Sequence, residues 1–290
     1  MAALMGGLSR PLAAAAAERT LGEVQRVAAL DWALAATLLG IGITPVAIAD
    51  VAGYREKVGD PALPDGVVDL GPYWEPNLEV LQRSRPELIL RASWQAATRT
   101  LLERIAPTAV FDIYSRNGPP LANSRAVALA MAEATGRDAA GAAFVARADS
   151  AMAAARGSLR DFRRPVYLVD LNQDGRNAWI LGPNGLTHEV LLSIGLKNAW
   201  EGQTNSFGFA SIGIEQLGSS PEACLLYLDS GPRTAIALAR LQRSPLWTQL
   251  PFVRAGRVRP VPVFYTNGGL ATAIRFSELA TKSLSELRDG

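Results

Sequence analysis

Short apolar runs alternate with amphipathic segments along the first half of the chain. The apolar runs at 26–30 and 45–49 predict two buried strands, and the Ala/Leu-rich stretch 32–39 between them predicts a helix that ends at Gly40. The alternation continues with three further apolar runs, at 67–70, 87–90 and 107–113. Strands that alternate with helices at this spacing predict a mainly parallel sheet covered by helices on both faces.

The middle of the chain has a different pattern. Residues 137–162 contain no proline, and apolar side chains recur there every three or four positions, which is the spacing of one face of a helix. These side chains are Ala140, Phe144, Ala148, Ala151, Met152, Ala155, Leu159 and Phe162. A continuous helix of about 26 residues would be roughly 39 Å long, enough to span two lobes.

After this helix the alternation of strands and helices begins again. Apolar runs predict strands at 165–171, 177–181 and 223–228, with a helix at 187–194. The segments 75–87 and 212–222 also resemble each other, because each contains a Glu near the start of a helix and leads to a Pro-Glu pair and a strand. The chain therefore contains two similar halves.

We predict an α/β protein of two similar lobes, with mainly parallel sheets, joined by one long interdomain helix. The predicted divisions are an N-terminal lobe at 25–136, the helix at 137–163 and a C-terminal lobe at 164–290. Residues 1–24 include an alanine tract but no basic start, and we expect a disordered or residual signal segment there. Two lobes on one helix leave a cleft between them, which is where ligands bind.

Composition excludes several classes of function. The 29 Lys and Arg residues nearly balance 27 Asp and Glu, without a long basic run, so we expect no nucleic-acid partner. No stretch reaches the roughly 18 consecutive apolar residues of a membrane span. The chain has a single histidine, His188, and a single cysteine, Cys224. No second imidazole or thiol is present to complete a metal cluster or a His-based catalytic site, so we expect no catalytic residue and no metal site.

Sequence motifs of enzymes are also missing. The chain has no G-x-S-x-G, no G-x-G-x-x-G after a strand and no P-loop, so an α/β hydrolase or oxidoreductase is a distant alternative. Cys224 lies in an apolar run, where a buried strand residue is expected.

Aromatic residues follow the predicted strands. Those that we assign to the cleft are Tyr73, Trp74, Trp94, Phe207 and Tyr265. The carboxyl ends of parallel strands line the ligand crevice of an open α/β sheet, so these side chains should converge, although any one of them could pack on its own lobe. Polar candidates on the same wall are Asn177, Trp179 and Asn267, with Arg91 and Arg275 as charged donors or, equally, surface cations.

Several blocks of sequence resemble the periplasmic ferric-hydroxamate-binding proteins of the FhuD type. The most specific are Asn198-Ala199-Trp200-Glu201-Gly202-Gln203-Thr204-Asn205 and Pro251-Phe252-Val253-Arg254-Ala255-Gly256-Arg257, and others include Glu75-Pro76-Asn77-Leu78-Glu79 and Gly182-Pro183-Asn184. The resemblance covers the chain from about Arg26 to the last helix. It implies a solute receptor of an ABC importer with a helical backbone and no cofactor of its own, because the siderophore carries the iron.

The resemblance also implies positions for the ligand. Trp32, Trp94 with Gln95, Phe207 and Tyr265 match ligand-facing positions of the family, and 177–179 matches another contact loop. The chain departs from the enterobacterial members in one respect. Their hydroxamate-binding arginine is replaced by the run Pro72-Tyr73-Trp74, and their adjacent tyrosine by Gln95. Arg91 could be a relocated donor, or the siderophore could differ.

Two acidic residues match the family's permease-docking positions. Glu79 and Glu215 occupy equivalent places in the two halves, so we expect docking to an inner-membrane ABC permease through them, although an exposed Glu is usually a solvated surface charge. The resemblance further implies a monomer in the periplasm with a ferric siderophore as partner. The alternative is a receptor of the same fold for a catecholate or mixed siderophore, haem or cobalamin. Haem would require an axial His or Tyr, and His188 is expected at the surface or at a helix cap.

Overall fold

The computed structural model describes residues 24–115 and 118–287. The leader expected at 1–24 therefore lies outside the described residues, apart from Val24. None of the helices in these two ranges is both long and apolar enough to cross a membrane.

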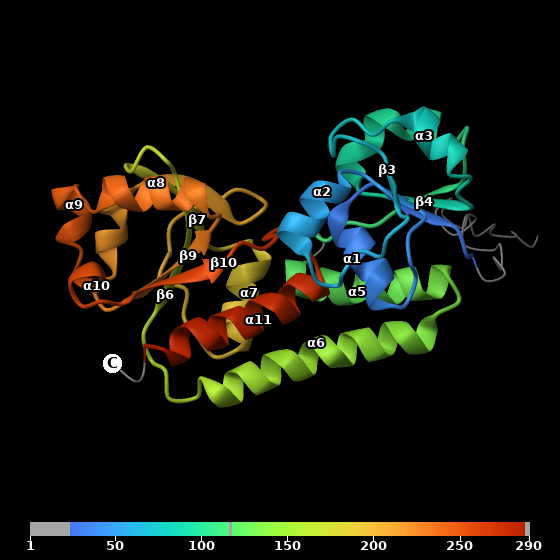
Figure 1. Cartoon of the computed structure of the whole chain (residues 1–290). Coiled ribbons are helices and arrows are strands. Elements are labelled where there is room, and N and C mark those ends of the chain that lie inside the picture. The colour runs from blue at the N-terminus through green and yellow to red at the C-terminus, as the bar shows by residue number, and fades with distance from the viewer. Residues whose placement is uncertain (1–23, 116–117, 288–290) are drawn as a thin grey trace, which may run out of the picture.

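The N-terminal lobe is built on a five-stranded parallel sheet (Figure 1). Its strands are β1 (Val27–Ala29), β2 (Ala47–Ile48), β3 (Val68–Asp69), β4 (Leu88–Arg91) and β5 (Thr108–Val110), in the order β3-β2-β1-β4-β5. The connecting helices are α1 (Trp32–Gly40), α2 (Val51–Gly53), η2 (Tyr54–Val58), α3 (Leu78–Arg83), η3 (Ser93–Thr98) and α4 (Arg99–Leu102). All four strand pairs are parallel, as the alternation of the sequence predicts.

The C-terminal lobe contains a second five-stranded sheet. Its strands are β6 (Val166–Leu171), β7 (Asn177–Leu181), β8 (Phe209–Gly213), β9 (Cys224–Asp229) and β10 (Val258–Pro262), in the order β10-β9-β6-β7-β8. Its helices are α7 (Leu186–Ser193), η4 (Ile214–Ser219), α8 (Pro232–Leu241), α9 (Pro245–Thr248) and α10 (Pro251–Arg254). The prediction of mainly parallel sheets is confirmed, with one exception. Strand β7 runs antiparallel to β6 and β8, because a tight hairpin containing Asp174 and Gly175 joins it to β6.

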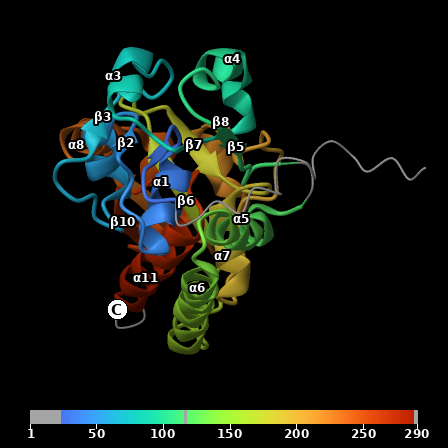
Figure 2. The same ribbon diagram turned by 90° about the vertical axis from the view of Figure 1, so that its right-hand side faces the viewer.

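Three helices connect the lobes along one side of the molecule. Helix α6 (Asp138–Ser158) runs beneath both lobes, with α5 (Pro120–Ala134) and α11 (Leu270–Ser285) packed against it (Figures 1 and 2). The long helix predicted at 137–162 is present but ends at Ser158, and Leu159 and Phe162 still fold back into the core. Helix α5 was not predicted from the sequence.

Small residues allow these helices to approach closely. A Cβ atom added to Gly141 of α6 would lie 2.4 Å from the Cβ of Ala132 on α5. At the end of α1, a Cβ on Gly40 would lie 2.6 Å from the ring of Phe144 on α6. Glycine is therefore required at both crossings, since side-chain bulk would separate the helices.

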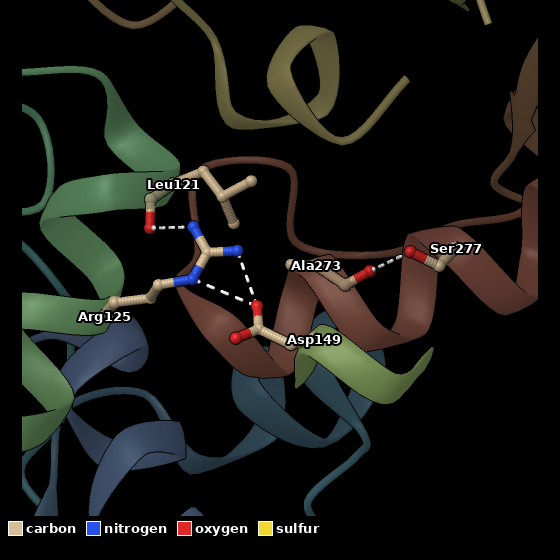
Figure 3. A network of polar contacts seen from close by, with 5 residues as sticks. All are labelled: Leu121, Arg125, Asp149, Ala273 and Ser277. Carbon is tan, nitrogen blue, oxygen red and sulfur yellow. Dashed lines mark hydrogen bonds and ion pairs between the residues drawn. The ribbon is translucent and has the colours of Figure 1, made fainter. Parts of the chain in front are cut away.

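An ion pair also joins α5 to α6 near the crossing of the three helices (Figure 3). Arg125 donates to Asp149 Oδ1 through Nη2 at 2.6 Å and through Nε at 3.0 Å, and its Nη1 reaches the carbonyl of Leu121. Both side chains are partly exposed, so solvent screens the pair and its contribution to stability is small.

A single hydrophobic cluster extends through both lobes. It contains Leu34 and Leu38 of α1, Phe144 and Met152 of α6, and Leu168 of β6, all of them buried. Because side chains from the two sheets and from α6 belong to one close-packed core, rotation of one lobe against the other must disturb that core. The fold therefore holds the space between the lobes in a largely fixed shape.

Candidate ligand-binding cleft

A cavity of about 470 Å³ lies where the carboxyl ends of the N-terminal strands face the C-terminal lobe. The N-terminal lobe supplies residues that follow β1, β3, β4 and β5, and the C-terminal lobe supplies the start of β8 and the segment after β10. Of the sixteen described residues that line it, eight are aromatic: Tyr73, Trp74, Trp94, Phe111, Tyr114, Phe207, Phe209 and Tyr265. We call this cavity the cleft.

Stacked rings form the floor of the cleft. The rings of Tyr73 and Trp94 are stacked with centroids 5.5 Å apart, and Tyr265 of the other lobe lies next to Tyr73. Trp32 lies behind them and does not line the cavity, with its centroid 4.9 Å from Tyr73 and 5.2 Å from Tyr265. Its indole Nε1 donates to the carbonyl of Ala49 at 2.9 Å, which fixes the ring. Trp32 therefore supports the floor from the interior.

A second set of rings forms the wall on the side of the C-terminal lobe. Phe207 contacts Phe209 at 6.3 Å between centroids, and it contacts Tyr114 of the N-terminal lobe at 5.4 Å. Gly208 has φ +80, and a Cβ atom there would lie 2.1 Å from the Cα of Gly185, so only glycine fits between the two phenylalanines. Asn205 Oδ1 accepts hydrogen bonds from the backbone N–H of Phe207 and of Phe209, which stabilises the turn.

A buried carboxylate lies at the centre of the floor. Asp31 caps α1 by accepting from the N–H of Ala33 at 2.8 Å, and its Oδ2 accepts from the hydroxyl of Tyr73 at 2.7 Å. Burial raises the pKa of Asp31, and the hydrogen bonds from Tyr73, from the backbone and from Trp94 offset that shift only in part. Burial also raises the pKa of Tyr73 and Tyr265, so both are neutral phenols that can donate hydrogen bonds.

The remaining polar groups lie on the segments after β4, β5 and β10. Asp112 Oδ1 accepts from the N–H of Ser93 at 2.8 Å, and both residues line the cleft with Asn267. The hydroxyl of Tyr114 donates to the carbonyl of Thr266 at 3.3 Å, which ties the two lobes together. Sequence reasoning missed Asp31, Phe111, Asp112 and Tyr114, although the rule that strand ends line the crevice applies to them as well.

The structure brings together six of the residues assigned to the cleft from sequence: Tyr73, Trp74, Trp94, Phe207, Tyr265 and Asn267. Three others support the cleft without lining it. Trp32 lies behind the floor, as described. Gln95 is buried, accepts from the N–H of Ala92 and donates to the carbonyl of Leu30. Trp179 contacts Phe209 edge-on at 5.5 Å and extends the wall outside the cavity.

Three predicted residues lie away from the cleft. Arg91 is buried and points to the same face of the sheet as Ile89, because side chains two positions apart in a strand share a face. Asn177 forms a hydrogen bond with Asp174 in the hairpin before β7. Arg275 lines a separate cavity with Asp229 and Glu278. None of these side chains reaches the cleft in this structure, and the sequence alone could not predict their directions.

Metal-binding side chains do not gather in the described part of the chain, where no group of three or more His, Cys, Asp or Glu could hold an ion. His188 lies on α7 and lines a different cavity, with Glu189 and Pro120. Burial lowers the pKa of His188. Cys224 is buried in β9, as its apolar surroundings in the sequence predict.

Comparison with known proteins identifies the family. A model of the family described as periplasmic binding protein matches residues 27–262. The iron(3+)-hydroxamate-binding protein FhuD of Escherichia coli is 33% identical over 255 residues, which cover 88% of this chain and 85% of that protein. The chain belongs to the FhuD-type periplasmic binding proteins.

Solved structures agree with the fold. The siderophore-binding protein FhuD from Vibrio cholerae, bound to Fe3+-Desferal, has a TM-score of 0.82 and 26% identity, and the match covers 91% of this chain and 98% of that chain. The catecholate-siderophore-binding protein VctP from Vibrio cholerae has a TM-score of 0.66 at 17% identity, covering 91% and 94%. The likeness to VctP, at 17% identity, concerns the fold alone. The fold by itself therefore does not indicate one class of chelate.

Proposed function

We propose that this FhuD-type protein binds a ferric siderophore of the hydroxamate kind in the cleft and delivers it to the inner-membrane permease of an ABC importer. The observation that carries the proposal is the cleft itself, where rings from both lobes enclose about 470 Å³, in a chain 33% identical to a hydroxamate-binding relative. The protein acts as a monomeric receptor in the periplasm, and it performs no chemistry on its ligand.

The chemistry of the lining fits a ligand that brings its own iron. A siderophore satisfies the coordination of the metal, so its receptor needs apolar contact and a few donors instead of metal ligands. Aromatic rings supply the contact, and the neutral hydroxyl of Tyr265 can donate to an iron-bound oxygen atom, whereas the proton of the Tyr73 hydroxyl is already donated to Asp31. Ser93 and Asn267 add polar groups at the edge of the cleft.

Haem is a poorer fit to the same cleft. A haem receptor usually supplies an axial His or a Tyr, and His188 lines another cavity. The phenols that do line the cleft, Tyr73, Tyr114 and Tyr265, have pKa values raised by burial, which disfavours the phenolate that would bind iron.

The two proposed docking residues lie outside the cleft. Glu79 is exposed on α3 of the N-terminal lobe, and Glu215 is exposed on η4 of the C-terminal lobe. Arginines of a permease could therefore reach both carboxylates without displacing the ligand. Exposed ion pairs of this kind contribute orientation and association rate more than affinity.

Titration of tryptophan fluorescence tests the proposal. Trp94 and Trp74 line the cleft, so a ferric chelate that enters it should quench emission in a saturable way. We expect quenching by ferric trihydroxamates at micromolar or lower concentration, with the iron-free siderophores, haem and cobalamin as controls. Quenching by haem or cobalamin alone, with no response to any ferric siderophore, would overturn the proposal.

A further inference from the structure

The charges that line the cleft all have one sign. Asp31 and Asp112 are its only charged side chains among the described residues, and no described Lys or Arg lines it. A ligand in this space meets carboxylates and the faces of aromatic rings. Both groups attract positive charge, since the face of an aromatic ring carries a negative partial charge.

Among the described residues, two cations on elements next to the cleft are Arg91 of β4 and Lys57 of η2, and neither lines the cleft. Arg91 is buried on the face of the sheet that also carries Ile89, and it does not line the cleft. Lys57 Nζ lies 6.0 Å from the ring centroid of Trp32, which is itself covered on the cleft side by Tyr73 and Tyr265. Protein therefore separates both cations from the cleft.

The two carboxylates differ in whether an oxygen is free to accept a hydrogen bond from a ligand. Both oxygens of Asp31 are used, Oδ1 by the N–H groups of Ala33 and Leu34 and Oδ2 by Tyr73. Asp112 accepts the N–H of Ser93 through Oδ1, and its Oδ2 makes no hydrogen bond within the described residues. Asp112 is also only half-buried, so a ligand can reach it. Asp112 is therefore the acceptor that remains open to a donor on the ligand.

We propose that the cleft selects ferric chelates by charge, with positively charged chelates bound most tightly and anionic ones least, and that Asp112 accepts a hydrogen bond from a pendant ammonium group. This inference rests on the proposed function and narrows its ligand class. Three hydroxamates neutralise ferric iron, so a pendant ammonium makes the whole chelate a cation. Three catecholates around ferric iron leave a multiply charged anion. In the cleft this anion would lose hydration and lie near two carboxylates, with no described cation to offset the repulsion, so it should bind weakly.

A ligand series that varies only the pendant charge tests this selection. The probes are the ferric complex of Desferal, whose free amine is protonated at neutral pH, its N-acetyl derivative, which is neutral there, and its N-succinyl derivative, which carries a carboxylate. All three have the same iron centre. We expect dissociation constants to rise by about fivefold from the first to the second and again to the third at low ionic strength, and the steps to shrink in high salt.

The variant Asp112→Asn tests the assigned residue. Asparagine keeps the shape and can still accept the N–H of Ser93, but it removes one of the two carboxylates, so the differences in affinity among the three complexes should become clearly smaller. Glu133→Gln is the matched control, because Glu133 is an exposed acid on α5 that does not line the cleft. This control should retain differences in affinity of wild-type size.

Each outcome separates the inference from the proposed function. Equal and tight binding of all three complexes to the wild-type protein would overturn charge selection and leave the receptor function intact. Failure of all three to bind would overturn the receptor function. Differences in affinity of wild-type size in Asp112→Asn would overturn the assignment to Asp112. Circular dichroism of the variant confirms that it is folded before its affinities are compared.

Discussion

The hydroxyl oxygens of Tyr73 and Tyr265 lie 3.3 Å apart, although the two residues belong to different lobes. Tyr73 also donates to Asp31 and stacks on Trp94, while Tyr265 contacts Trp32 edge-on. The floor of the cleft is therefore a point of contact between the lobes. Because helix α6 and the shared core join the lobes below this point, the cleft is largely formed before a ligand arrives.

Removal of one ring from the floor should weaken binding without unfolding the protein. Trp94 is about half exposed in the cleft, so Trp94→Ala deletes contact area that a ligand would cover. We expect a loss of affinity of roughly tenfold or more for a ferric trihydroxamate. Isothermal titration calorimetry measures it without relying on the fluorescence of the deleted residue.

Trp247→Phe is the control for that experiment. Trp247 is buried against Phe252 in the C-terminal lobe and does not line the cleft. Its replacement should leave the affinity unchanged. Equal affinity of Trp94→Ala and the wild-type protein would place the ligand elsewhere.

Asp31 makes stability depend on pH in a defined direction. Burial raises its pKa above the ordinary value of 3.8, so the folded protein binds this proton more tightly than the unfolded chain does. The contribution of Asp31 to the free energy of unfolding therefore falls as pH rises from 3.8 through the raised pKa. Asn does not titrate, so Asp31→Asn removes this loss. The difference in free energy of unfolding, variant minus wild type, should therefore increase from about pH 3 to pH 7. Urea denaturation at both pH values measures the change.

Asp174→Asn provides a control of opposite sign. Hydrogen bonds from the backbone of Arg176 and Asn177 lower the pKa of Asp174, so its contribution to stability is present above the ordinary pKa and disappears as pH falls. This variant should lose stability relative to wild type as pH rises over the same range. The same pH trend in both variants would contradict the burial of Asp31.

Two glycines of α6 should respond in opposite ways to alanine. In Gly141→Ala the new Cβ atom would lie 2.4 Å from Ala132, so the crossing with α5 must open, at a cost of about 1–3 kcal/mol. Gly157 has no atom within 4 Å of the same position, and Gly157→Ala should stabilise the helix by about 0.5–1 kcal/mol. Urea unfolding of both variants compares them directly, and an unchanged Gly141→Ala protein would mean that α5 and α6 do not pack as described.

Delivery should fail when both docking carboxylates are removed. In the Glu79→Ala, Glu215→Ala double variant we expect uptake of iron-labelled chelate by cells with the matching permease to fall to background, while the affinity for the chelate is unchanged. The matched control replaces the exposed Glu56 and Glu133 with alanine and should keep uptake. A double docking variant that loses chelate binding would assign these residues to the fold or the ligand site instead.

The sequence by itself determined the architecture. Periodicity along 137–162 predicted α6, and the alternation of apolar runs predicted strands in both lobes, because buried strands and amphipathic helices leave local patterns. The rule that strand ends line the crevice placed Tyr73, Trp94 and Tyr265 correctly after β3, β4 and β10, whereas Phe207 reaches the cleft from the segment before β8. Local patterns did not lead to a prediction of α5 or of the antiparallel direction of β7, which depends on one hairpin turn.

Only the tertiary structure decided which side chains share the cleft. Arg91 is the last residue of β4 and Trp94 follows three positions later, yet Arg91 shares the face of the sheet that carries Ile89, and only Trp94 lines the cleft. The polar chain of Asp31, Tyr73 and Tyr265 joins positions up to 234 residues apart along the sequence. Local patterns record burial, but the direction of a side chain beyond a strand end and its partners across a lobe boundary are set by packing between distant segments.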